Sequence, residues 1–122
     1  MEYNQRMSEF KPFTIERPWG NFRQFNLNSP VTVKIVTIKE NEELSLQNHA
    51  RRAEFWRIIG GSGTIEIGND KHDAQVGDEY NVPVGTKHRA VAGPFGLAFL
   101  EVDTGDFDEN DEVRYEDKYG RA

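Results

Sequence analysis

The chain has 122 residues, a length that suits one domain with a hydrophobic core of its own. Its 21 acidic and 15 basic residues give a formal net charge of −6, which disfavours a nucleic-acid partner or an anionic membrane surface. The sequence contains no cysteine, so disulfides, thiolate zinc sites and a cysteine nucleophile are excluded. It has neither an apolar run of membrane-spanning length nor a signal-peptide pattern, and we expect a cytoplasmic protein.

Short apolar or alternating segments follow one another along the chain, separated by glycine, proline, asparagine and aspartate. This rhythm is typical of an all-β sandwich or barrel. We expect a flexible polar segment over residues 1–11 and a single domain over residues 12–122 that ends in an acidic tail. The predicted strands span residues 21–26, 32–39, 43–47, 55–59, 63–68, 71–75, 79–82, 88–92 and 97–103. Residues 110–119 are expected to form a helical turn.

Three potential metal ligands, Gln47, His49 and Glu54, lie close together in the sequence, and a fourth, His88, follows the turn VPVGTK. Because successive side chains of a strand point to opposite faces, Gln47 and His49 share one face. Each residue alone has an ordinary explanation, such as a surface histidine or a glutamate paired with a nearby arginine. Their combination favours a divalent metal site, with zinc first and iron, manganese, nickel or cobalt as alternatives.

The segments around these residues carry a family resemblance. They are ERPWG at 16–20, VKIVTI at 33–38 leading into LSLQ at 44–47, RAEFW at 52–56, VPVGTKHR at 82–89, LEV at 100–102 and DEVRYEDKYGR at 111–121. In this order, over nearly the whole chain, they resemble the C-terminal isomerase domain of type II mannose-6-phosphate isomerases. These domains are cupins, so the resemblance implies a double-stranded β-helix, or jelly-roll barrel, with a metal held by Gln47, His49, Glu54 and His88.

The resemblance also implies a reaction, the interconversion of mannose 6-phosphate and fructose 6-phosphate. The metal would act as a Lewis acid toward the developing enediolate. A base must move a proton between adjacent carbons, and Glu54, Glu101 and Lys34 remain open for this role. The phosphate requires a cationic anchor, since the chain as a whole is acidic. The cationic candidates are Lys34, Arg52, Lys87, Arg89 and Arg114, of which Arg52 and Arg114 are favoured.

Some positions depart from the family pattern. Ala50, Arg51 and Phe55 stand where the family commonly has histidine. We expect Phe55 to remove a group that could assist proton transfer or substrate binding, which supports an alternative function as a non-catalytic sugar-phosphate-binding cupin. A metal-dependent oxygenase is a third hypothesis, and Gln47 in place of a histidine weakens it. The chain has no glycine-rich phosphate loop, so guanylyltransferase activity is not expected.

The remaining expectations concern packing and assembly. We expect most aromatic side chains to fill the barrel core rather than stack on a sugar. The RPWG segment, residues 17–20, should pack the N-terminal strand against the barrel. The tail at residues 111–121 should cover an open end of the barrel or exchange with a neighbouring subunit, and a homodimer is expected because dimers are common among cupins.

Overall fold

The computed structural model describes residues 11–122, and within them the regular secondary structure consists of β-strands. The strands are β1 (Phe13–Arg17), β2 (Gly20–Gln24), β3 (Val31–Ile38), β4 (Leu46–Asn48), β5 (Arg52–Ile67), β6 (Asp70–Gln75), β7 (Glu79–Val82), β8 (His88–Gly105) and β9 (Val113–Glu116). The all-β prediction is confirmed. The expected flexible segment, residues 1–11, lies outside the described residues except for Lys11. In the part of the chain that is described, no helix is long and apolar enough to cross a membrane.

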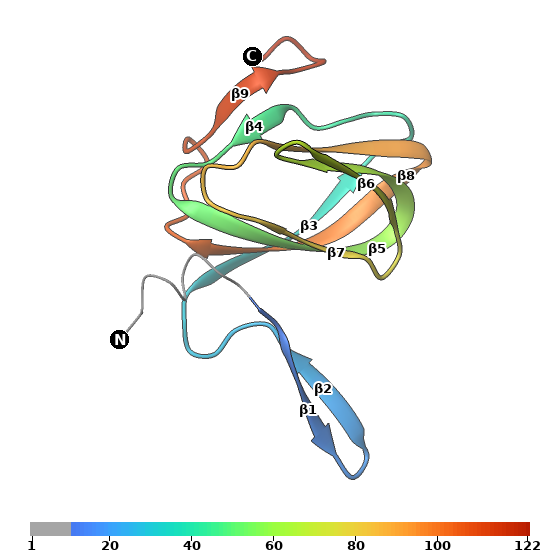
Figure 1. Cartoon of the computed structure of the whole chain (residues 1–122), viewed down its shortest axis with the longest axis vertical. Helices are drawn as coiled ribbons and strands as arrows, with labels where there is room; N and C mark the ends of the chain where they lie inside the picture. Colours follow the sequence, from blue (N-terminus) through green and yellow to red (C-terminus); the bar gives the residue numbers. More distant parts are fainter. Residues whose placement is uncertain (1–10) are drawn as a thin grey trace.

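Two long antiparallel strands, β5 and β8, run through both layers of a flattened barrel (Figure 1). One layer has the order β7–β5–β8–β3, built on the first half of β5 and the second half of β8. The other layer has the order β6–β5–β8–β4–β9 and uses the remaining halves. The start of β8 is thereby folded back over the start of β5.

The core lies between the two layers. It includes Trp56 and Ile58 of β5 and Phe99 of β8, all of them buried, and the rings of Trp56 and Phe99 stack at 4.3 Å between centroids. Phe55 points to the opposite face of β5, where it packs with Phe25 at 5.8 Å between ring centroids. Alternation along β5 therefore separates an inner face from an outer one.

Glycines bend the two long strands where the prediction had placed strand ends. Residues 55–59 and 63–68 are predicted as separate strands, but residues 55–59 and 63–67 both belong to β5 because a register shift at Gly61 and Gly63 lets the ladder continue. The backbones approach closely there. A Cβ on Gly61, whose φ is +68°, would lie 2.0 Å from the carbonyl oxygen of Gly96.

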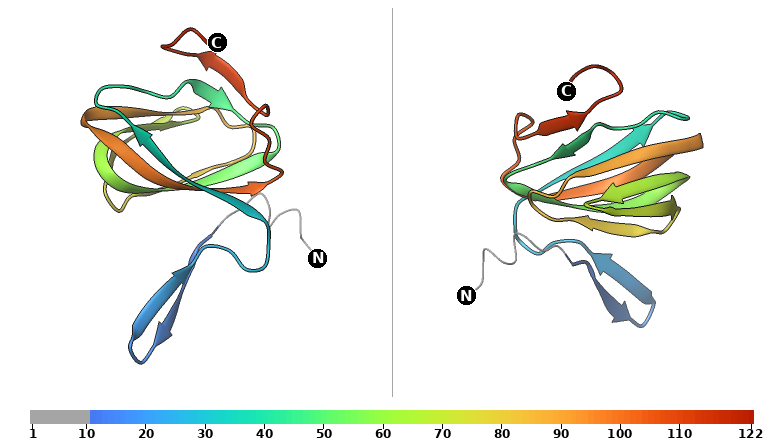
Figure 2. Two further views of the ribbon diagram at one scale, coloured as in Figure 1. Left: turned by 180° about the vertical axis from the view of Figure 1, so that it is seen from behind. Right: turned by 45° about the horizontal axis from the view of Figure 1, so that its top comes forward.

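Two expectations about the ends of the chain are wrong. Pro18 and Trp19 form the tip of a β1–β2 hairpin that projects from the barrel, so this segment does not pack the N-terminal strand against it (Figure 2). Trp19 is 73% exposed. The tail contains β9 in place of a helical turn. A short isolated helix is costly to nucleate, whereas β4 offers an edge to which Val113 and its neighbours hydrogen-bond.

We predict that Gly61→Ala destabilises the fold by roughly 2–4 kcal/mol, because the left-handed backbone and the clash with the Gly96 carbonyl both penalise a side chain. The matched control is Gly77→Ala, which has a φ of +96° but no atom within 4 Å of the added Cβ. It should cost only about 1 kcal/mol. Urea denaturation measures both, and equal losses of stability would contradict the packing argument.

Candidate metal centre

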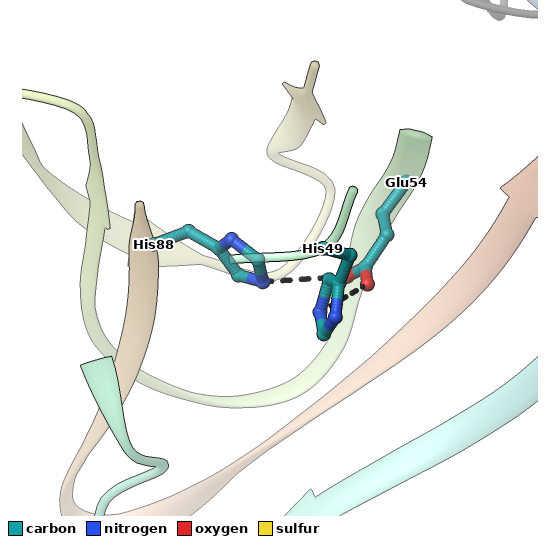
Figure 3. A group of neighbouring side chains, drawn as sticks. All are labelled: His49, Glu54 and His88. Atoms are coloured by element: carbon teal, nitrogen blue, oxygen red, sulfur yellow. Dashed lines mark ion pairs between the residues drawn. The ribbon is translucent and has the colours of Figure 1, made fainter. Parts of the chain in front are cut away.

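Three of the four predicted ligands converge inside the barrel (Figure 3). His49 follows β4, Glu54 lies near the start of β5, and His88 begins β8. One ligand atom from each comes within 4.8 Å of the others, and all three side chains are buried. Nε2 of His49 is 3.1 Å and Nε2 of His88 is 3.8 Å from the Glu54 carboxylate.

Hydrogen bonds on the outer side of each ring fix which imidazole nitrogen faces inward. Nδ1 of His49 donates to the Asp111 carbonyl at 2.7 Å, and Nδ1 of His88 donates to the Thr86 carbonyl at 2.9 Å. A carbonyl oxygen only accepts, so each Nδ1 carries the hydrogen and each neutral ring keeps its Nε2 lone pair. Nε2 of His88 is buried without a hydrogen-bond partner among the described residues. This is the orientation of metal-ligating histidines, whose other nitrogen donates to an acceptor.

The charge of Glu54 is held in place by several donors. Burial opposes the ionised form, but hydrogen bonding by His49 and the charges of both histidines hold its pKa at about 2. Nε1 of Trp56 donates to one carboxylate oxygen at 2.9 Å, and Nε of Arg52 donates to the other at 3.2 Å. Glu54 is therefore a carboxylate at neutral pH, which leaves an anion and two imidazoles around one point.

The two histidines differ in their affinity for protons. Burial dominates at His88 and lowers its pKa, so this ring is neutral. Burial also acts to lower the pKa of His49, but the hydrogen bond and charge of Glu54 outweigh it and raise that pKa. A proton on Nε2 of His49 lies between this nitrogen and the Glu54 carboxylate. A divalent cation could replace the proton and bind both groups. The residues present thus fit a metal ion with nitrogen and oxygen ligands.

Gln47 stands beside this group on β4, where its backbone pairs with His88 of β8. With its amide nitrogen turned toward Glu112, it donates to the two carboxylate oxygens at 2.5 and 3.1 Å. Its role as a fourth ligand stays a prediction.

Glu54 also belongs to a second group, which consists of three carboxyl side chains. Glu101 and Asp103 of β8 lie with Glu54 so that one oxygen of each falls within 4.8 Å of the others. Burial first, and then the charge of Glu54, raises the pKa of Glu101; burial likewise raises that of Asp103. Neither oxygen of Asp103 has a donor among the described residues unless Glu101 carries a proton. A protonated Glu101 donates to Asp103 and satisfies both groups. Lys34 lies 3.6 Å from Glu101.

Arg52, one of the two favoured phosphate anchors, is buried. Its side chain is 5% exposed, and its Nη1 donates to the Asp108 carbonyl at 3.3 Å. The ring of Phe107 lies between two cations, 4.5 Å from the Arg52 guanidinium carbon and 4.6 Å from Lys34 Nζ. The loop before β9 thereby covers Arg52, and a ligand that reaches this guanidinium must displace Phe107.

The other predicted cations lie outside the buried group. Arg114 pairs with Glu112 at 2.7 Å, and the Lys87 ammonium lies 4.0 Å from the centre of the Tyr115 ring. Arg89 forms ion pairs with three acidic residues, Glu43, Glu66 and Glu116. These contacts place Lys87, Arg89 and Arg114 on the face shared by β4, β8 and β9.

The residues that depart from the family pattern also lie outside the group of His49, Glu54 and His88. Ala50 and Arg51 are exposed in the loop after β4. Phe55 faces the outer side of β5, opposite to Glu54 and Trp56, and packs on Phe25. The expectation that Phe55 removes a group from the site is therefore wrong.

Asp111 contacts the loop that carries His49, and the sequence did not indicate this contact. Its carboxylate accepts hydrogen bonds from the backbone nitrogens of Ala50 and Arg51 at 2.8 and 2.9 Å, and its carbonyl accepts from His49. The tail thus holds the ligand loop from 60 residues further along the chain. Trp56 and Asp103 were also missed, although each lies two positions from a predicted site residue and so on the same strand face.

Comparison with known proteins finds a family model and several related proteins that match this chain. The family model described as Mannose-6-phosphate isomerase C-terminal matches residues 4–117. A mannose-1-phosphate guanylyltransferase from Salmonella montevideo is 36% identical over 109 residues, which are 88% of this chain and 23% of that protein. The chain spans about a quarter of the length of the curated relatives it matches.

Solved structures show the same fold. Oxalate decarboxylase from Bacillus subtilis superposes with a TM-score of 0.64 and 27% identity over 70% of this chain and 24% of that one. A cupin protein from Bacteroides fragilis superposes with a TM-score of 0.57 and 20% identity over 75% of this chain and 82% of that one. The predicted cupin fold is confirmed.

We predict that Asp111→Ala weakens metal binding by about tenfold to a hundredfold, because the His49 ring loses the anchored carbonyl that orients it. Calorimetric titration with Zn²⁺ and the visible spectrum of the Co²⁺ form measure affinity and ligand geometry. Asp117→Ala is the matched control, since Asp117 lies in the same tail but pairs with Arg121. Unchanged affinity in Asp111→Ala would rule out this positioning role.

Proposed function

This chain belongs to the mannose-6-phosphate isomerase C-terminal family, and we propose that it is a metal-dependent phosphosugar isomerase that interconverts mannose 6-phosphate and fructose 6-phosphate. The observation that carries the proposal is the convergence of two imidazole Nε2 atoms on an ionised, buried Glu54. The protonated Glu101 beside this group adds a proton donor and acceptor that a purely structural metal site does not need.

The metal would be held by His49, Glu54 and His88, with Gln47 as the fourth ligand. When bound, it supplies a Lewis acid that polarises the sugar carbonyl and stabilises negative charge on the neighbouring oxygen. The chain's own residues must bind the sugar, exclude water and move the proton.

Glu101 is the proposed group for proton transfer. Its pKa is raised by burial and by the charge of Glu54, whereas Glu54 itself is held ionised at a pKa of about 2 and is a poor base. Asp103 can share the proton of Glu101, and Lys34, 3.6 Å away, stabilises Glu101 when it is ionised. Of the two carboxyl candidates, the raised pKa of Glu101 favours it over Glu54, and Lys34 takes the supporting role beside Glu101.

The phosphate is proposed to bind to Arg52 once Phe107 leaves the guanidinium. Arg114 and Lys87, on the face shared by β4, β8 and β9, stay predicted as further anchors. Arg52 has a planar, bidentate donor set, and a dianion suits it better than the ring of Phe107 does. The carbonyl of Asp108, which accepts from Arg52, would also give way.

The test is turnover of mannose 6-phosphate by the metal-reconstituted chain, with and without chelator. We predict that Glu101→Gln lowers kcat by about a hundredfold or more, because the amide cannot transfer the proton, while metal content is unchanged. The control is Glu109→Gln, since Glu109 also pairs with Lys34 at 3.6 Å but is exposed. Lack of turnover by the fully metallated wild-type chain on any hexose or pentose phosphate refutes the isomerase proposal.

We predict that Phe55→His leaves kcat within about twofold of wild type, because the side chain at position 55 faces away from Glu54. It should lower the free energy of unfolding by about 1–3 kcal/mol, since a polar ring replaces a buried one against Phe25. Enzyme assay and urea denaturation measure the two effects. If wild type binds the sugar phosphate without turnover and Phe55→His restores it, the non-catalytic alternative is correct.

A further inference from the structure

Glu112, the residue just before β9, contacts one of the predicted metal ligands. Its two carboxylate oxygens accept hydrogen bonds from the amide nitrogen of Gln47 at 2.5 and 3.1 Å. Nη2 of Arg114 lies 2.7 Å from the same carboxylate, and the Glu112 side chain is only 17% exposed. An ion pair on an open surface contributes little to stability, but this carboxylate also reaches a side chain of the candidate metal centre.

The strand pairing places Gln47 on the side of the sheet that faces the metal centre. Gln47 of β4 lies directly opposite His88 of β8. Residues opposite each other in antiparallel strands have their side chains on the same face of the sheet. The ring of His88 points into the barrel toward Glu54 (Figure 3), so the side chain of Gln47 shares that inner face.

The chemistry of the amide makes its orientation matter. A glutamine binds a cation through its carbonyl oxygen, because its NH2 group only donates hydrogen bonds. A carboxylate only accepts, so Glu112 selects the NH2 end of Gln47. Oε1 of Gln47 is thereby turned away from Glu112 and is available as a ligand atom. Metal-ligating histidines are oriented in the same way, by an acceptor that holds the nitrogen not bound to the metal.

Two adjacent residues of the tail thus contact two of the predicted ligands. The carbonyl of Asp111 accepts from Nδ1 of His49, and the carboxylate of Glu112 accepts from the amide of Gln47. The pairing of β9 with β4 keeps this part of the tail in register with the strand that carries the ligands. The tail therefore belongs to the support of the metal centre at more than one point.

We propose that Glu112 is a positioning residue of the metal centre, which holds the Gln47 amide so that its oxygen is presented to the cation. This role rests on the metal site of the proposed function and does not require turnover. Arg114 assists, because a carboxylate that is paired on its other side keeps a fixed orientation toward Gln47. The same contact accounts for an amide at position 47, since a carboxylate there would face Glu112 with like charge.

The first test follows the amide itself in the metal-free full chain. The side-chain NH2 resonances of Gln47 are assigned by their loss in Gln47→Ala. In wild type they should be protected from exchange with solvent. Glu112→Ala should move them toward the shifts and exchange rates of an exposed amide, because the acceptor is gone.

The second test is metal affinity, measured by calorimetric titration with Zn²⁺ and by the visible spectrum of the Co²⁺ form. Glu112→Ala should weaken binding by about tenfold to a hundredfold and alter the Co²⁺ spectrum. Glu116→Ala is the matched control, since Glu116 lies in β9 but pairs with Arg89, and it should bind metal as wild type does. Circular dichroism checks that each variant is folded.

Two further variants separate the orientation of the amide from the charge of Glu112. Glu112→Gln loses the charge but keeps an oxygen that accepts from Gln47, so it should weaken binding by less than about fivefold. Gln47→Ala should itself weaken binding, and Glu112→Ala added to it should cause no further loss, because the amide to be oriented is absent.

Three results would overturn the positioning role: equal weakening by Glu112→Ala with and without Gln47, equal weakening by Glu116→Ala, or Gln47 NH2 resonances that Glu112→Ala leaves in place. None of these measurements involves a sugar phosphate. A failure of the isomerase proposal, seen as lack of turnover by the metallated wild-type chain, is therefore distinguishable from a failure of this one.

Discussion

The antiparallel pairing of β5 with β8 is the constraint on which the rest of the structure depends. Its register places Asp103 opposite Glu54 and Glu101 opposite Trp56, so the carboxylates gather on one inner face. The glycine bend in both strands then folds the start of β8 back over the start of β5. His88 and Glu54 are far apart along this ladder, and yet Nε2 of His88 lies 3.8 Å from the Glu54 carboxylate. Without the bend, the inner face would be acidic and would lack its second imidazole.

Buried charge explains why so many side chains surround Glu54. Three carboxyl groups share a volume from which water is largely excluded, and ionisation of all three would be costly. Burial opposes the charge on Glu54, but hydrogen bonds from His49 and Trp56 and the charges of the two histidines keep the pKa of Glu54 low. Glu101 retains a proton instead, beside Lys34. Neighbouring carboxyl groups whose pKa values are moved apart are suited to different roles, one as a ligand and one as a proton carrier.

The sequence predicts this site in part, and the limits have physical reasons. Local spacing and the family resemblance identify His49, Glu54 and His88, because their positions relative to strands and turns are visible in the chain. Period-two alternation also indicates where Trp56 should point. Asp111 cannot be found in this way, since its contact with the His49 loop depends on a tail that returns after 60 residues. For the same reason β9 was predicted as a helical turn: its partner, the edge of β4, is not adjacent in sequence.

Successive side chains of β5 point to opposite faces of the strand. Residues of the candidate metal site therefore alternate with residues that only pack against the outer surface. Glu54 and Trp56 point inward to the polar group, while Phe55 and Arg57 point outward to Phe25 and Glu79. Sequence proximity to a ligand is therefore a poor guide to function in this strand. A residue beside a ligand lies on the opposite face, and its replacement alters the surface on which the connecting segment and hairpin rest. The change from the family's histidine to Phe55 is consequently a change in outer packing: it extends the apolar contact with Phe25 and leaves the inward face of β5 as it was.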